Sequence, residues 1–518
     1  MCSSRCAAGC CGAMTRRGFL SASAAAAGAV MLGGRLLGAQ DAPPAGEPAW
    51  QGPGRKYQPI LRACFVRRKG EYGMRWPGQV YDGEAARKIY IQKIQDAGKD
   101  LNVKLDLREL PLYSLAESKA WLAQAKDAQA DGLLVVLLDR QEHAWPTANL
   151  AIDSGLPTVV YSPVGSSFTT NTAGPSRKGG AVVYSTDDFS QPAYGLKMLA
   201  AGARMKRTKV VVIEGARRRE AVLPQLGIQL QYVPAATFVN AYNALGEGEE
   251  MRKMADAYIA QSAGLVGGAT RQDVINGARS YMTARQILQD EQADGISMDC
   301  LGSLGPTKLS LPCLAWSKMN DDAIPAACEA DVGAVASHVI VQYLFDRPGF
   351  QQDPVGETAK QAIIGAHCSC PTRLNGFGRP GEPYTIRHHH AQRDATPHPT
   401  WKIGQDVTSL DVEWSSAARP ARPARATKAG GAATQPATQA VPASAQPPQA
   451  ELIISAGKVV ENVQVPPAGG CVISVMVKFD NVEDVLAYPG FHQIFFYGHY
   501  KRHLVDFCRL FKLTPRVV

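Results

Sequence analysis

The stretch DGLLVVLLD, residues 131–139, is a short apolar run closed at each end by an aspartate. Comparable runs occur nearby, namely ILRACFV (60–66), VKLDLREL (103–110) and PTVVYS (157–162). We predict that each run is a strand and that the segments between them, such as 115–128, are helices. This alternation predicts a parallel sheet with helices on both faces, and therefore an α/β domain over residues 56–175. The polar loop PVGSSF after the last strand is the kind of place where open sheets bind ligands.

A second unit of the same kind is predicted over residues 176–315. Its expected strands are AVVYS (181–185), KVVVIEG (209–215), GLVGGA (264–269) and DGISMDCLG (294–302). A helix is expected over 272–290, between the last two strands. The chain therefore reads as two Rossmann-like parallel-sheet domains. Neither contains a GxGxxG stretch or a P-loop, so a nucleotide cofactor is not expected.

The pattern changes after about residue 372 to short alternating strands separated by Gly/Pro turns. The segments are PYTIRHHH (383–390), WKIGQDVTSLDVEW (401–414), ELIISAGKVVEN (451–462) and GGCVISVMVKFD (469–480). They predict a β-rich C-terminal domain within a region that spans 316–518. Residues 416–450 have no aromatic residue and no core pattern, so we predict a disordered insertion inside this domain. A final helix is expected over 499–511.

The N-terminus resembles a twin-arginine export signal. Arg16-Arg17 precede Phe19-Leu20 and a mild Ala/Gly-rich apolar run. We predict a signal peptide over 1–39, a flexible lead-in over 40–55, and a protein exported through the Tat translocon to the periplasm or beyond. The alternative is a short anchoring helix. No later stretch is long and apolar enough to span a membrane.

Composition narrows the classes of partner. The chain has 518 residues, too many for one core, and two to four domains are expected. Its net charge is +9, and residues 1–39 hold four arginines and no acids, so the mature charge is 9 − 4 = +5. That charge is too small to indicate a nucleic-acid partner. The 12 cysteines include no CxxC pair, so a structural zinc site is not expected and buried free thiols are the default interpretation.

Two acids flank a helical stretch in IPAACEADVGAVASHVIVQYLFDRPGFQQDP, residues 324–354. Glu329 stands before an apolar helical stripe, and Asp353 follows it. Between them, DRPGFQQD (346–353) can turn the chain back, so that both acids approach one point. The plainer interpretation is that Glu329 and Asp331 are acids at a helix start and that Asp353 is a loop residue.

Three short stretches together resemble the L-fucose isomerase and L-arabinose isomerase superfamily. ACEAD is followed by an acid 353 − 329 = 24 residues later, as in the pair of carboxylate metal ligands of that superfamily. IIGAHCSCP places His367 soon afterwards, in the manner of a GxH…CP pattern. YPGFHQIFFYGH places His492 where fucose isomerases have a metal-binding histidine. The resemblance is strongest from residue 294 onward.

The resemblance implies a metal-dependent aldose–ketose isomerase that acts on a pentose or deoxyhexose through an enediol. It implies that Glu329, Asp353, His492 and His367 hold a divalent metal, with Mn²⁺ expected for such a ligand set. Glu329 and Asp353 would also serve as the catalytic acid–base groups. We further expect a small sugar as partner and a homo-oligomer.

Other residues and other functions stay open at this stage. His143, Arg387 and His390 are candidates for contacting the sugar, although solvated or structural histidines are the plainer interpretation. Asp331 is expected behind the ligands or at a helix start. The main alternative function is an exported sugar-binding protein that keeps the isomerase fold without turnover, because export suits that role. A hydrolase or epimerase on the same metal site is a third option.

Overall fold

The computed structural model describes residues 50–70, 74–76, 79–80, 82–140, 142–307, 309–388, 394–414, 448–463 and 473–518. The predicted signal peptide, most of the lead-in, most of the insertion and His390 lie outside the described residues. All of the described residues belong to one compact unit, 46–518.

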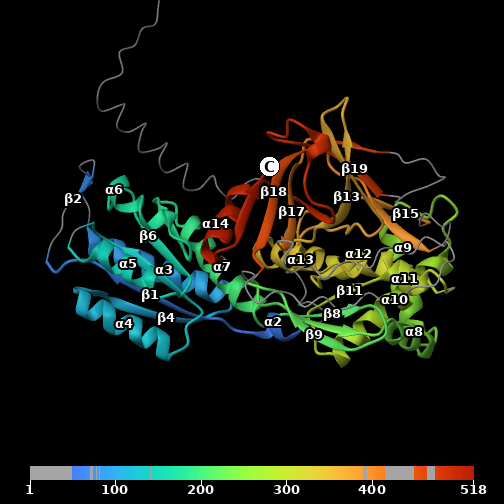
Figure 1. Ribbon diagram of the computed structural model, residues 1–518, viewed down its shortest axis with the longest axis horizontal. Helices are drawn as coiled ribbons and strands as arrows, with labels where there is room; N and C mark the ends of the chain where they lie inside the picture. The colour runs from blue at the N-terminus through green and yellow to red at the C-terminus, as the bar shows by residue number, and fades with distance from the viewer. Residues whose placement is uncertain are drawn as a thin grey trace, which may run out of the picture. The chain divides into compact units, whose positions relative to one another are not determined.

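Five parallel strands form the first sheet, in the order β4-β1-β5-β6-β7 (Figure 1). Their bounds are β1 (Ile60–Val66), β4 (Lys104–Leu112), β5 (Gly132–Leu137), β6 (Thr158–Ser162) and β7 (Ala181–Ser185). The helices of this region are α3 (Gly83–Asp100), α4 (Leu115–Asp127), α5 (Ala144–Asp153) and α7 (Ser190–Met205). Helices α3 and α7 cover one face of the sheet, and α4 and α5 cover the other.

Strand β5 is continuously apolar because helices cover both faces of the first sheet. Leu134 and Val136 lie in the core under α3 and α7, whereas Leu133 and Val135 lie in the core under α4 and α5. Successive side chains of a strand point to opposite faces, and here both faces are covered. The predicted parallel sheet with helices on both faces is confirmed.

The second sheet has the order β12-β11-β8-β10-β9, with β9 antiparallel at its edge. Its strands are β8 (Lys209–Ile213), β9 (Arg219–Val222), β10 (Gln229–Val233), β11 (Gly295–Met298) and β12 (Ala326–Cys328). Its helices are α8 (Ala235–Ala244), α9 (Glu249–Gln261), α10 (Arg271–Asp290), α12 (Cys313–Asp321) and α13 (Val332–Phe345). Helices α8, α10 and α12 share a core with one face.

The C-terminal sheet has the order β17-β20-β13-β14-β19-β18-β21 and closes on itself through a further pairing of β17 with β18. Its strands are β13 (Phe350–Glu357), β14 (Ala362–His367), β17 (Asp406–Trp414), β18 (Ala450–Asn462), β19 (Ile473–Phe479), β20 (Gln493–Tyr497) and β21 (Thr514–Val517). All its pairings are antiparallel except β18–β21. Helix α14 (Lys501–Phe511) lies between β20 and β21 in the chain. The predicted fold class, two α/β sheets followed by a β-rich region, is therefore confirmed.

Shorter elements complete the described chain. They are α2 (Pro53–Lys56), β2 (Met74–Arg75), β3 (Gln79–Val80), α6 (Thr169–Thr172), η2 (Pro175–Arg177), α11 (Cys300–Leu304), β15 (Tyr384–His388), β16 (Ala395–Pro399) and η4 (Val485–Ala487). Among the described residues, no helix has the length and apolar character needed to cross a membrane.

Helix α13 lies between the second sheet and the C-terminal sheet. Its residues from Gly333 to Phe345 are all buried. Val339 and Ile340 share a core with Val212 of β8 and Val412 of β17. A helix enclosed on all sides by packed elements has little freedom to move, because protein interiors are close-packed. Both of its ends are therefore held in fixed places.

Three details of the sequence prediction are wrong. AVVYS (181–185) is β7 of the first sheet rather than a strand of the second, since it pairs in parallel with β6. GLVGGA (264–269) forms only an isolated bridge, between Leu265 and Ile386. The chain does not end in the helix α14, because β21 follows it and adds to β18.

The insertion connects two neighbouring strands. Trp414 at the end of β17 pairs with Ala450 at the start of β18. The residues between them thus join the two arms of a hairpin, as expected for a loop insertion inside one domain. Residues 415–447 lie outside the described residues.

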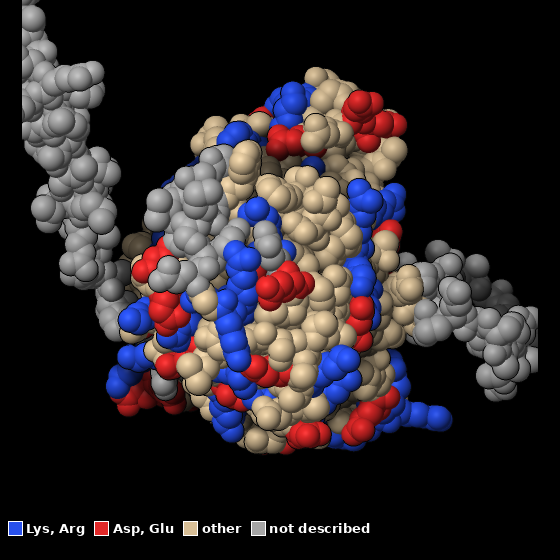
Figure 2. All heavy atoms as spheres, turned by 90° about the vertical axis from the view of Figure 1, so that its left-hand side faces the viewer, with Lys and Arg blue, Asp and Glu red and all other residues tan. Residues whose placement is uncertain are grey.

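Charged side chains of both signs are mixed on the face shown in Figure 2, where Lys and Arg alternate with Asp and Glu. Ion pairs follow the same pattern, for example Lys178 with Asp153 at 2.8 Å and Arg108 with Glu117 at 3.1 Å. Such exposed pairs contribute little to stability. The expectation of no nucleic-acid partner stays a prediction.

Candidate metal centre

A short turn between β12 and α13 carries the first acid of the site. β12 ends at Cys328, and the next two residues, Glu329 and Ala330, have left-handed backbone with φ of 60° and 53°. Residues other than glycine adopt this conformation uncommonly, and such strain concentrates at functional sites. The turn holds Glu329 at the carboxyl end of a parallel sheet, where α/β proteins bind ligands.

Asp331 connects the start of helix α13 to an imidazole. Its Oδ1 accepts hydrogen bonds from the backbone N–H groups of Gly333 (2.8 Å) and Ala334 (3.0 Å). Its Oδ2 lies 2.9 Å from Nδ1 of His492. Burial raises the pKa of Asp331, but His492 and the two amides lower it by more, so the pKa is below its usual value. Asp331 is therefore an ionised helix cap that fixes the orientation of the His492 ring.

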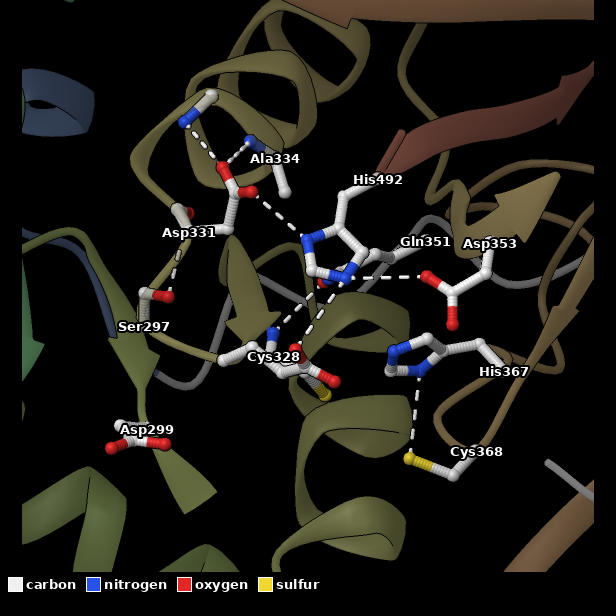
Figure 3. A network of polar contacts seen from close by, with 12 residues as sticks. Ser297, Asp299, Cys328, Asp331, Ala334, Gln351, Asp353, His367, Cys368 and His492 are labelled. Atoms are coloured by element: carbon white, nitrogen blue, oxygen red, sulfur yellow. Dashed lines mark hydrogen bonds and ion pairs between the residues drawn. The ribbon is translucent and has the colours of Figure 1, made fainter. Parts of the chain in front are cut away.

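The second nitrogen of His492 faces two further carboxylates. Its Nε2 lies 3.2 Å from Oδ1 of Asp353 and 3.8 Å from Oε2 of Glu329. Figure 3 shows the ring between Asp331 on one side and Asp353 on the other. Burial lowers the pKa of His492, yet Asp331 and Asp353 outweigh it and raise the pKa to about 10. With Nδ1 held by Asp331, Nε2 is the atom that the ring presents to a ligand.

The strand register of the C-terminal sheet explains why distant residues meet. Strand β13 lies between β14 and β20. Asp353 on β13 pairs with the residue before His367, and the residue before Asp353 pairs with the residue after His492. Pairing partners are about 5 Å apart. His367 and His492 are therefore placed on either side of Asp353.

The return of the chain after α13 brings Asp353 back to Glu329. Helix α13 has 14 residues and is about 21 Å long. It ends at Asp346, which has left-handed backbone with φ of 50° and pairs with Lys197. Strand β13 then begins at Phe350 and runs back. The return that the sequence predicts over 346–353 is present.

The loop before β20 sets the position of His492. Gly490 has φ of 88°, and a Cβ there would lie 2.8 Å from both Oδ2 of Asp411 and Nε2 of Gln493, so only glycine fits. The same Asp411 oxygen accepts the backbone N–H of Phe491 at 3.1 Å. Burial raises the pKa of Asp411 to about 7. The sequence analysis does not single out this acid, because nothing local distinguishes it from a surface aspartate.

The donor atoms suit a cation. Glu329, His367 and His492 each offer one ligand atom, and the three atoms lie within 4.8 Å of one another. Nε2 of His492 and Oδ1 of Asp353 are buried and face each other at 3.2 Å. Carboxylate oxygens and imidazole nitrogens bind divalent first-row cations. Glu329, His367 and His492 could therefore hold a metal ion. With Asp353, which contacts His492 at 3.2 Å, they are called here the carboxylate–imidazole cluster (Glu329, Asp353, His367, His492).

The other predicted contact residues lie elsewhere. His143 is buried beside the first sheet, and its Nε2 contacts the carbonyl oxygen of Leu112 at 2.8 Å. Arg387 is exposed on β15. Its neighbour His388 contacts Asp273 at 3.0 Å, at the start of α10. His390 lies outside the described residues, and the sugar-contact roles of all three candidates stay predictions.

Four buried thiols next to the cluster were not foreseen as a group. Cys328, Cys368 and His367 offer ligand atoms that lie within 4.8 Å of one another. The thiol of Cys313 contacts that of Cys368, and the thiol of Cys300 contacts that of Cys328. Contact with Cys313 and burial raise the pKa of Cys368 well above its usual value, although the contact with Cys328 acts in the opposite direction. We call these residues the thiol row (Cys300, Cys313, Cys328, Cys368).

A sequence signal for the thiol row does exist. Cys328 stands directly before Glu329, and Cys368 stands directly after His367. Two predicted metal ligands thus each have a cysteine as neighbour. The CxxC pattern describes two thiol ligands on one local turn. A chain without such a pair can therefore still assemble a thiol site from separate segments, which the pattern does not detect. Here Cys300, Cys313 and Cys328 belong to α11, α12 and β12, and Cys368 directly follows β14.

Comparisons with known proteins add little to this geometry. No protein-family model matches the chain, and no curated protein matches it. Among solved structures, it is similar to a sugar ABC transporter (sugar-binding protein) from Bacillus halodurans. The identity is 15%, the match covers 58% of this chain and 91% of that one, and the TM-score is 0.16. A likeness at that level carries no functional argument.

Proposed function

We propose that this protein is a metal-dependent aldose–ketose isomerase acting on a pentose or deoxyhexose. The observation that supports it most is the arrangement around His492. Two carboxylates, Glu329 and Asp353, face the same ring nitrogen, while Asp331 holds the other. Isomerisation needs such a pair of acid–base groups beside a group that stabilises charge on the sugar oxygens.

The proposed cation is Mn²⁺, held by Glu329, Asp353 and His492, with His367 as a further ligand. Oxygen-rich sites with one or two imidazoles suit Mn²⁺ or Mg²⁺ better than softer ions. A bound divalent cation would polarise the O1 and O2 oxygens of the sugar. Without a cation, the proton on His492 balances part of the negative charge of the nearby carboxylates. A bound cation would take over that role. Asp331 keeps its role in either state, since it holds Nδ1.

The carboxylates carry the proton transfers in this proposal. One of them removes the proton from C2 of the aldose while O1 gains a proton, which gives the enediol. The O2 hydroxyl then loses its proton, and a proton is delivered to C1, which gives the ketose. We assign the transfers at carbon to Asp353, whose Oδ1 is buried and lies 3.2 Å from Nε2 of His492. A positioned general acid–base group contributes about 10²–10⁴ in rate.

Export through the twin-arginine route to the periplasm or beyond remains part of the proposal. That route carries folded proteins, which suits a site assembled from distant strands. Arg16-Arg17 can be tested directly. Replacing both with Lys is expected to hold the precursor in the cytoplasm. A homo-oligomer is likewise proposed, to be measured by light scattering.

Deuterium exchange at C2 of the sugar tests the function. Mature protein loaded with Mn²⁺ is incubated in D₂O with fucose, arabinose, xylose or rhamnose, and exchange is followed by NMR. We expect exchange with one of these sugars, its loss after chelation, and its loss in Asp353→Asn. Asp346→Asn, at the far end of α13, is the matched control and should exchange normally. Sugar binding without exchange for any sugar would favour the sugar-binding protein instead.

A further inference from the structure

We propose that Cys328, His367 and Cys368 form a second metal site, selective for a soft or borderline cation of the Zn²⁺ class. The three donor atoms already lie within 4.8 Å of one another, and all three residues are buried. This inference does not depend on isomerase activity. It concerns the thiol side of His367, whereas the proposed isomerase cation sits on the carboxylate side.

The geometry suits such an ion. Sγ of Cys368 lies 3.5 Å from Nδ1 of His367. Zinc bonds of about 2.3 Å to sulfur and about 2.0–2.1 Å to nitrogen, at a tetrahedral angle, place the two donors about 3.6 Å apart. Figure 3 shows this nitrogen of His367 directed at Cys368 and the rest of the ring directed toward His492. The pair is therefore spaced as two ligands of one ion.

Charge also favours a divalent ion here. Thiolate is the form that binds a metal ion, so binding displaces the thiol protons. Two thiolates, one neutral imidazole and Zn²⁺ sum to zero net charge, which is the least costly combination to bury. Cys300 and Cys313, at either end of the thiol row, are the nearest further thiols.

The two sites would then bind different cations, with softer ions at the thiols and harder ions at the carboxylates. Thiolates select Zn²⁺ or Cu⁺, whereas carboxylates and imidazole accept Mn²⁺. His367 belongs to both groups of donor atoms. Occupation of the thiol site takes one nitrogen of this ring and fixes the ring in place. We therefore expect Zn²⁺ on the thiols to change the affinity of the carboxylate–imidazole cluster for Mn²⁺.

Cobalt is the probe that separates the sites, because Co²⁺ bound to thiolate gives a sulfur-to-metal charge-transfer absorption. Reduced full-length protein is titrated with Co²⁺ and then with Zn²⁺. We expect the sulfur band in the unaltered protein and in Glu329→Gln, and its removal by Zn²⁺. Cys368→Ser should abolish the band and weaken Zn²⁺ binding by more than about 100-fold, beyond the usual cost of losing a residue behind the ligands.

Cys370→Ser is the matched control. Cys370 is also fully buried, two residues farther along the same segment, and its Sγ contacts the Pro371 carbonyl at 3.5 Å. It should retain the sulfur band. A missing band in the unaltered protein, or equal loss in Cys368→Ser and Cys370→Ser, would overturn the proposal.

A measurement on the unaltered protein covers the case in which the variants misfold. Alkylation under mild denaturation, mapped by mass spectrometry, reports which thiols a cation protects. Zn²⁺ should slow alkylation of Cys328 and Cys368 by at least tenfold more than that of Cys64 or Cys508, which lie in the first sheet and in α14. Uniform protection, or none, would count against the site. Loss of Mn²⁺-dependent sugar exchange alone would bear only on the isomerase.

Discussion

The first sheet is parallel throughout and the second is parallel except for its edge strand β9, but their carboxyl ends differ in what the polar groups contact. At the first sheet, Asp139 follows β5 and accepts the backbone N–H of Arg68 at 2.8 Å. His143 contacts the carbonyl oxygen of Leu112 at 2.8 Å. Both side chains are buried and both serve the backbone of their own domain. These two side chains at the carboxyl end of the first sheet therefore hold loops together.

At the second sheet, the corresponding groups meet side chains from another layer. Cys328 ends β12 and Glu329 follows it, and the C-terminal region brings Asp353, His367 and His492 against them. The carboxyl end of a parallel sheet is thus only a favourable position. It becomes a candidate site where a second layer supplies complementary groups.

The largest contrast is expected in turnover. Asp353→Asn removes the charge and the basic lone pair while it preserves shape, so kcat for ketose formation should fall by about 10²–10⁴. Asp139→Asn makes the same chemical change at the first sheet and should leave kcat within twofold, since Asn can still accept the Arg68 N–H. Steady-state assays with the active sugar compare the two. A large loss in Asp139→Asn would place catalysis at the first sheet instead.

Metal affinity should separate the same two regions. Glu329→Gln replaces a charged ligand by a neutral one, and we expect Mn²⁺ affinity to fall by at least about 10–100-fold. Titration calorimetry of chelator-treated protein measures it, with Asp139→Asn as the comparison. Unchanged affinity in Glu329→Gln would remove this residue from the metal set and leave the strained turn without a functional reason.

A stability effect without a metal effect is expected at the first sheet. His143→Phe keeps a buried ring but leaves the Leu112 carbonyl without its donor, which costs about 1–3 kcal/mol. Urea denaturation should show that loss, while Mn²⁺ affinity stays as in the unaltered protein. If His143→Phe weakens sugar binding and leaves the free energy of unfolding unchanged, the predicted contact of His143 with the sugar is supported.

The smallest effect concerns pH and the acid below the His492 loop. The pKa of Asp411 rises on folding from 3.8 to about 7, so the folded protein holds this proton more tightly between those values. Its contribution therefore makes the metal-free protein less stable as pH rises from about 4 to about 7. Asp411→Asn cannot ionise and should flatten that part of the Tm profile. If the Tm profiles of the two proteins run parallel, the pKa of Asp411 does not rise on folding and the prediction is wrong.

Local patterns predicted much of this structure. The run DGLLVVLLD is continuously apolar because β5 is covered on both faces, and that is visible without coordinates. The apolar stripe of α13 and the turn after it likewise indicate that Glu329 and Asp353 approach each other. These signals work because each lies within a few turns of chain, where periodicity and turn chemistry act.

Non-local pairing set the limit of the prediction. AVVYS (181–185) suits either sheet, and only the neighbouring strand decides between them. The thiol row could not be assembled from sequence, since Cys300, Cys313, Cys328 and Cys368 come from separate segments of the chain. Asp411 could not be singled out from the sequence for the same reason. Its pKa is raised by burial under a loop that lies 80 residues farther along the chain.

The contact of Asp331 with His492 spans 161 residues of sequence. During synthesis, Glu329, Asp353 and His367 leave the ribosome well before His492 does. The ligand set is therefore incomplete until β20 has joined β13, which is a slow, high-contact-order step. Metal uptake should consequently mark the end of folding rather than nucleate it, and a chain cut short of residue 492 would be a poor competitor for the ion.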